Sequence, residues 1–173
     1  MEERAGVVYL SRFGTVFAVA DRFVPNRFVW PRPVSLLQHG MMFSDGVKIV
    51  TISEYFRDRF FRKIEEPVGA GMLQWMDIST SPTDHEIAKA AGGPECLVME
   101  LQQVFELLSR QPNCRGPGSL AWWGPDNLFY CLDKDDAMQS VLIRQAIGGW
   151  HVSAEEFSSK QSRRGCRLFT QMK

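Results

Sequence analysis

Short apolar runs separated by turn-forming residues are the feature that most limits how this chain can fold. The clearest example is Asp45-Gly46, which lies between apolar runs at residues 41–44 and 47–53. Asp-Gly suits a two-residue hairpin turn best, because both central residues of that turn need a positive φ. We therefore predict that these two runs form a β-hairpin.

Several other segments also predict strands. Residues 6–10 and 15–20 are rich in Val, Tyr and Phe, and Gly14 lies in the segment between them, which predicts an N-terminal hairpin. Residues 128–132 would place apolar side chains on both faces of a strand, so we expect this strand to be central in its sheet. Further strands are predicted at residues 72–78, 120–123 and 166–171.

Capping residues and helical spacing predict helices between these strands. Ser53 is a good N-cap, and the helix that it opens is expected to end before Pro67. A helix is also predicted over residues 134–147, because Asp135 and Asp136 lie near its positive N-terminal end and glycines follow its last turn. The remaining helices are predicted after residues 81–84, with an end at Gly92-Gly93, and over residues 94–108.

Together these elements predict an α+β fold. Strand pairs come as hairpins and helices come in groups, which favours a predominantly antiparallel sheet with about three to four helices packed on it. The chain has 173 residues, of which 45% are hydrophobic and 23% are charged, as is typical of one globular core. We therefore expect a single globular domain over residues 1–173.

The composition also restricts where the protein is expected to reside. No run of about 18 apolar residues could span a bilayer, and the acidic start Met1-Glu2-Glu3 differs from the basic start of a secretory signal. The four cysteines include no C-x-x-C pair, so reduced thiols are expected, with a secreted two-disulfide form as the alternative. These features predict a cytoplasmic protein without a membrane span, and they indicate no oligomeric state.

Charged residues are unevenly distributed along the chain, although the formal net charge is zero. Residues 1–63 contain ten Lys and Arg against six Asp and Glu, residues 64–158 contain five against fourteen, and residues 159–173 contain five against none. Both ends of the chain are therefore basic and the middle is acidic. The folded surface is dipolar if these segments stay apart, and the charges neutralise one another if the segments interleave.

No motif in the sequence encodes a catalytic, metal or phosphate site. His39, His85 and His151 have no H-x-x-x-H or C-x-x-C partner, and no phosphate-binding glycine loop occurs. Cys131, Asp133 and His151 could form a nucleophilic site only if the fold brings them together. We therefore predict no cofactor and no metal, and a role other than catalysis.

One N-terminal segment combines arginine, aromatic and proline residues. Residues 22–33 contain three prolines, which prevent a regular helix, and two similar pentads that start at Arg22 and Arg27. Arginine and aromatic side chains are enriched at the energetic centres of protein interfaces, and a proline-stiffened segment loses little entropy on docking. The predicted binding residues are Arg22, Arg27, Phe28, Trp30 and Arg59.

From this segment we predict a non-enzymatic protein-binding module with a protein partner, such as an inhibitor, an immunity-type protein or a regulatory factor. The same aromatic residues could instead pack against the core, with the arginine heads in water. A second hypothesis is a nucleic-acid-binding protein that uses the N-terminal arginines and a basic tail containing Lys160, Arg163, Arg164 and Arg167. A third is an enzyme or small-ligand carrier whose pocket forms only in the tertiary fold.

Overall fold

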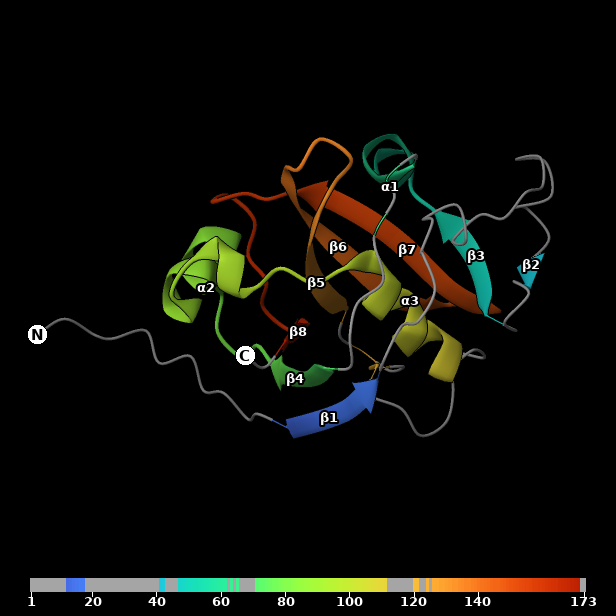
Figure 1. Cartoon of the computed structure of the whole chain (residues 1–173), viewed down its shortest axis with the longest axis horizontal. Coiled ribbons are helices and arrows are strands. Elements are labelled where there is room, and N and C mark those ends of the chain that lie inside the picture. Colours follow the sequence, from blue (N-terminus) through green and yellow to red (C-terminus); the bar gives the residue numbers. More distant parts are fainter. Residues whose placement is uncertain are drawn as a thin grey trace, which may run out of the picture.

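A mixed eight-stranded sheet forms the centre of the structure, a computed structural model (Figure 1). The structure describes residues 12–17, 41–42, 47–61, 63, 65, 71–111, 120–121, 124 and 126–171. The strands, in the sheet order β1-β4-β8-β5-β6-β7-β3-β2, are β1 (Arg12–Phe17), β4 (Gly71–Asp77), β8 (Arg167–Gln171), β5 (Asn127–Leu132), β6 (Met138–Ala146), β7 (Gly149–Glu156), β3 (Lys48–Ile52) and β2 (Met41–Met42). The helices in this part of the chain are α1 (Glu54–Phe60), α2 (Asp84–Ala91), the short 3-10 helix Pro94–Cys96 and α3 (Leu101–Arg110).

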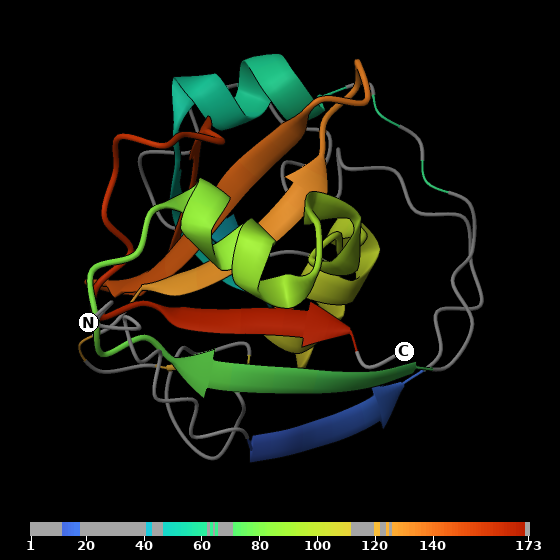
Figure 2. The same ribbon diagram turned by 90° about the vertical axis from the view of Figure 1, so that its left-hand side faces the viewer.

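Two pairs of neighbouring strands run parallel, namely β3 with β7 and β5 with β8. The other described pairs, such as β1 with β4 and β4 with β8, are antiparallel, and these three strands lie side by side in Figure 2. The predicted α+β class is therefore confirmed, but the sheet is mixed and not predominantly antiparallel. Turn residues reveal pairs of strands that follow each other closely, whereas each parallel pair joins strands separated by long connections.

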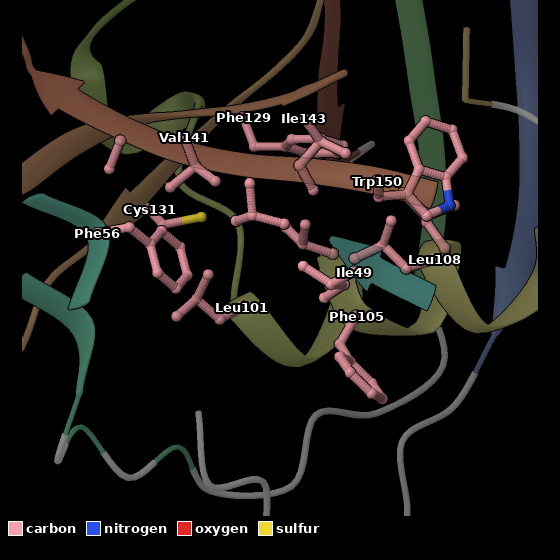
Figure 3. Close-up of a cluster of buried hydrophobic side chains, with 14 of the residues drawn as sticks. Ile49, Phe56, Leu101, Phe105, Leu108, Phe129, Cys131, Val141, Ile143 and Trp150 are labelled. Atoms are coloured by element: carbon pink, nitrogen blue, oxygen red, sulfur yellow. The ribbon is translucent and has the colours of Figure 1, made fainter. Parts of the chain in front are cut away.

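The first face of the sheet carries the larger core. Phe56 and Phe60 of α1 stack with their ring centroids 4.7 Å apart, and both are fully buried. The apolar stripe of α3 packs against the same face (Figure 3), where the buried residues from the two helices and the sheet include Leu101, Val104, Phe105, Leu108, Ile49, Phe129, Cys131, Val141, Ile143, Trp150 and Val152. Burial of this many apolar side chains is the main source of stability.

The second face carries a smaller core under α2. Ile87 and Ala88 of this helix contact buried side chains of β4, β5, β6 and β8, which include Met76, Leu128, Tyr130, Leu142 and Leu168. Figure 1 shows α2 and α3 on opposite sides of the sheet. Residues 127–131 of β5 are all buried, which confirms the prediction that this strand is central.

The prediction of a helix over residues 134–147 is wrong, because most of this segment is the strand β6. Val141 and Ile143 enter the core of the first face while Leu142 enters that of the second, so the apolar period is that of a doubly buried strand. The acidic residues and glycines that were expected at the two ends of this helix also suit two hairpin turns. Asp136 adopts a φ of 59° in the turn before β6, and Gly148 adopts a φ of 90° in the turn after it.

In other parts of the chain, the predictions made from turn and capping residues agree better with the structure. The predicted hairpin over residues 41–53 is confirmed as β2 and β3, but Met41 pairs with Ile49, which is one residue out of register with the two-residue turn predicted at Asp45-Gly46. Ser53 caps α1, as predicted, by accepting a hydrogen bond from the Phe56 amide, although the helix already ends at Phe60. Gly92 ends α2 with a φ of 93°. The predicted strands at residues 72–78 and 166–171 are confirmed as β4 and β8.

Two boundaries differ from their predictions. The turn expected around Gly14 lies inside β1, which pairs with β4 rather than with a neighbour in sequence, and the rest of that predicted hairpin is outside the described residues. The helix predicted over residues 94–108 begins with a short 3-10 turn, and α3 starts only at Leu101. Among the described residues, no helix combines the length and the apolar character that crossing a bilayer requires.

Candidate functional site

Three polar side chains form a row across adjacent strands on the second face. Arg144 of β6 pairs directly with His151 of β7. Asn127 pairs with Ile143, so Asp126, one residue earlier, lies beside Arg144. Trp150 and Ile143, their neighbours in sequence, belong to the core of the first face, which places the row on the opposite face. We call Asp126, Arg144 and His151 the charged row.

The side chains of the charged row influence one another through their charges but make no closer polar contact. None of them forms an ion pair or a hydrogen bond with any residue in the part of the chain that the structure describes. Arg144 is exposed, while Asp126 and His151 are half-buried. The buried carboxylates of Glu65, Asp84 and Asp133 all accept hydrogen bonds in this fold, whereas that of Asp126 accepts none from a described residue, which leaves it to water or to an external partner.

Electrostatic interactions along the charged row change the properties of its members. Burial raises the pKa of Asp126, and the positive charge of Arg144 only partly opposes this effect. Burial lowers the pKa of His151, and repulsion by Arg144 lowers it further. At neutral pH the imidazole is therefore uncharged, and the unpaired charges of the row are one carboxylate and one guanidinium.

A fully exposed isoleucine lies at the end of the hairpin that carries two of these residues. Ile147 occupies the turn between β6 and β7, and its relative exposure is 102%, whereas the other large apolar side chains whose burial the structure describes are at least partly covered. An exposed aliphatic side chain on the same hairpin as an exposed arginine is a common composition for a protein-binding surface.

A buried ion pair between Asp84 and Arg163 stabilises another part of the second face. The carboxylate of Asp84, at the start of α2, accepts hydrogen bonds from the Tyr130 hydroxyl at 2.8 Å and the Ser140 hydroxyl at 3.0 Å. Nε and Nη2 of Arg163 donate to its two oxygens, the latter at 2.8 Å, and the amide of Ser158 donates at 3.0 Å. Every polar group of this cluster is satisfied internally, which indicates a structural role.

The pKa values in this cluster follow from its geometry. Burial alone would raise the pKa of Asp84, but the hydrogen bonds and charge of Arg163 lower it below its ordinary value. Burial raises the pKa of Tyr130, and the neighbouring Asp84 carboxylate raises it further. Arg163 also donates to Glu155 at 2.7 Å, so the Glu155 carboxylate on β7 is paired, unlike that of Asp126.

Of the five predicted binding residues, Arg59 is the one that falls in the described part of the chain. Arg22, Arg27, Phe28 and Trp30 lie outside the described residues. Arg59 lies in α1 with its side chain 40% exposed; its guanidinium is 3.7 Å from the Asp133 carboxylate and 5.3 Å from the Tyr55 ring centroid. Arg59 is therefore part of a local contact between α1 and the turn after β5.

Two of the four basic tail residues considered for nucleic-acid binding are paired with acids. Arg163 is buried against Asp84, and Arg167 forms an ion pair with Asp77 at 2.7 Å. Lys160 and Arg164 are exposed. The C-terminal excess of positive charge therefore offers fewer free cations to a phosphate backbone than the sequence indicates.

The three residues considered for nucleophilic chemistry do not meet in the fold. Cys131 is fully buried in the core of the first face, and burial raises the pKa of its thiol, whereas His151 lies on the second face. The Asp133 carboxylate accepts hydrogen bonds from the amides of Asp135 and Ala137, which shapes the turn before β6. No group of three metal-ligating side chains occurs in the described ranges.

Sequence reasoning missed the charged row because it assigned β6 to a helix. The alternation of Gln139, Val141 and Ile143 with Ser140, Leu142 and Arg144 could have shown two faces of a strand. Comparison with known proteins adds no further guide, since no family model, curated protein or solved structure matches the chain.

Replacing Arg144 with Gln is expected to raise the pKa of His151 toward its ordinary value, because the repelling charge beside the imidazole is removed while its burial remains. NMR titration of the His151 ring protons measures this shift directly. Lys89→Gln, at an exposed position of α2, is the control and should leave the titration unchanged. An unchanged His151 titration in the Arg144 variant would show that the two side chains are not neighbours.

Proposed function

We propose that this protein is a non-enzymatic protein-binding module, of the inhibitor, immunity or regulatory type, and that the charged row and Ile147 form part of its recognition surface. The observation that carries the proposal is the absence of internal partners for Asp126, Arg144 and His151 among the described residues. Keeping the half-buried Asp126 and His151 without a hydrogen-bond partner costs stability, so a binding role gives a reason for them.

Mixed charge favours a protein partner over a nucleic acid. The Asp126 carboxylate beside Arg144 would repel a phosphate that the guanidinium attracts, whereas protein surfaces supply both signs of charge. Ile147 adds an aliphatic contact at the same end of the hairpin. The predicted residues Arg22, Arg27, Phe28, Trp30 and Arg59 remain a second proposed part of the binding surface.

A cytoplasmic location is also proposed. Cys131 and Cys166 are free thiols, and both are buried. Burial raises the pKa of Cys166 to about 11, so its reactive thiolate form is scarce at neutral pH. Stable unpaired thiols are typical of proteins that function in a reducing compartment.

Affinity capture from the native source, with the purified protein as bait, tests the proposed surface. Proteins enriched by the wild type are expected to be lost with Arg144→Glu and with Ile147→Asp, because the first reverses the charge of the row and the second places a charge in the apolar contact. Lys89→Glu, on the exposed side of α2, is the charge-matched control and should retain them.

The capture experiment separates the proposed function from its alternatives. If all three variants capture the same proteins as the wild type, the charged row is not the recognition surface. If the wild type captures no protein but is retained on a single-stranded oligonucleotide at low salt, the nucleic-acid hypothesis replaces the proposed function.

A further inference from the structure

We propose that the charged row binds a second copy of this chain, so that the charged rows of two copies face each other across a twofold axis. This inference rests on the proposed function and names the partner of the same site. The evidence is the order of charges along the row, which is complementary to itself.

The self-complementarity follows from the positions of Asp126 and Arg144. Asp126, directly before β5, lies beside Arg144 of β6; the two carry opposite charges and form no ion pair with each other. A twofold axis parallel to these strands, passing between the two residues, places Asp126 of each copy opposite Arg144 of the other. Two reciprocal ion pairs then form, as in any isologous interface.

The other polar groups of this face are compatible with such pairing. His151 is uncharged at neutral pH, since burial and Arg144 lower its pKa. Glu155 is already paired with Arg163 at 2.7 Å and adds no free charge. An axis parallel to β6 also keeps both hairpins pointing in the same direction, so both Ile147 side chains lie at one end of the interface.

Hydrophobic contact in this interface is limited to the hairpin ends, so a weak dimer is expected. Ion pairs near a surface contribute little to affinity but discriminate strongly between partners, because like charges placed opposite each other are costly. Reversing one charge of the row should therefore weaken self-association at least about tenfold, and the effect should be larger at low ionic strength.

Charge-swapped variants test the pairing directly. Asp126→Arg and Arg144→Asp should each be monomeric in sedimentation velocity at low ionic strength, at concentrations where the wild type dimerises. An equimolar mixture of the two variants should form a heterodimer, because each then offers the charge that the other lacks. The double variant Asp126→Arg/Arg144→Asp should regain the homodimer. Native mass spectrometry distinguishes the heterodimer from the homodimers by mass.

The outcomes separate this inference from the proposed function. A wild type that stays monomeric at all concentrations overturns the inference, and so do single variants that dimerise as well as the wild type. If the wild type is monomeric but still captures another protein in an Arg144-dependent manner, only the second copy is the wrong partner. If the charge reversals prevent folding, as circular dichroism would show, Asp126→Asn and Arg144→Gln take their place and should each weaken dimerisation.

Discussion

Replacing Asp84 with Ala is expected to lower the free energy of unfolding by about 3–5 kcal/mol, because the substitution leaves the Arg163 guanidinium buried without its main partner. The hydroxyls of Tyr130 and Ser140 lose the same acceptor. Asp84 is completely buried, and its ion pair joins α2 to a segment 79 residues later in the chain. Urea denaturation followed by circular dichroism measures the loss.

A second Asp–Arg pair in the same protein supplies the matched control. Asp77 binds Arg167 with two hydrogen bonds, at 2.7 and 3.1 Å, but its side chain is 56% exposed. Water can replace its contacts, so Asp77→Ala should cost no more than about 1 kcal/mol. Equal losses for the two variants would mean that the Asp84 cluster is not the buried anchor that its geometry indicates.

Removal of Glu65 is expected to have the second-largest effect, a loss of about 3 kcal/mol for Glu65→Ala. The two oxygens of this buried carboxylate accept hydrogen bonds from the amides of Leu101 and Gln102, at 2.8 and 2.9 Å, in the first turn of α3. Lys63 also donates to it at 2.9 Å. The substitution leaves two amides and an ammonium group in a dry environment. Chemical denaturation again provides the measurement.

Glu106→Ala is the control for Glu65. Glu106 lies on the exposed side of α3 and pairs with Arg110 one turn later. Such surface pairs contribute only about 0.3–0.5 kcal/mol. If the Glu65 variant is as stable as the Glu106 variant, the helix does not depend on the carboxylate at its N-terminus.

Local signals in the sequence predicted the elements that local interactions determine. Ser53 caps α1 and Gly92 ends α2, because a cap needs only the residues next to it. The same local signals left the structure of segment 134–147 ambiguous, because they fit either a helix or a strand between two turns. Asp135, Asp136 and the two glycines at 148–149 suit the ends of a helix and the turns of two hairpins equally well, and the burial of β6 on both faces decides between them.

Sequence patterns could not predict the contacts between segments that lie far apart in the chain. The parallel contact of β3 with β7 joins Ile49 to Trp150 across most of the chain, and no turn residue indicates it. The acid at the start of α2 was expected, yet its partner Arg163 was assigned to a basic tail. The charged row depends on the register of three strands at once, so its residues could be recognised only after β6 was known to be a strand.

The stability of the double variant Asp126→Asn/Arg144→Gln separates a binding surface from a structural one most directly. If the charged row is kept for a partner, the free energy of unfolding at low protein concentration should stay within about 0.5 kcal/mol of the wild type, since no hydrogen bond or ion pair with a described residue is lost. A loss of more than about 2 kcal/mol, approaching that expected for Asp84→Ala, would show that the row holds the fold together and is not reserved for a partner.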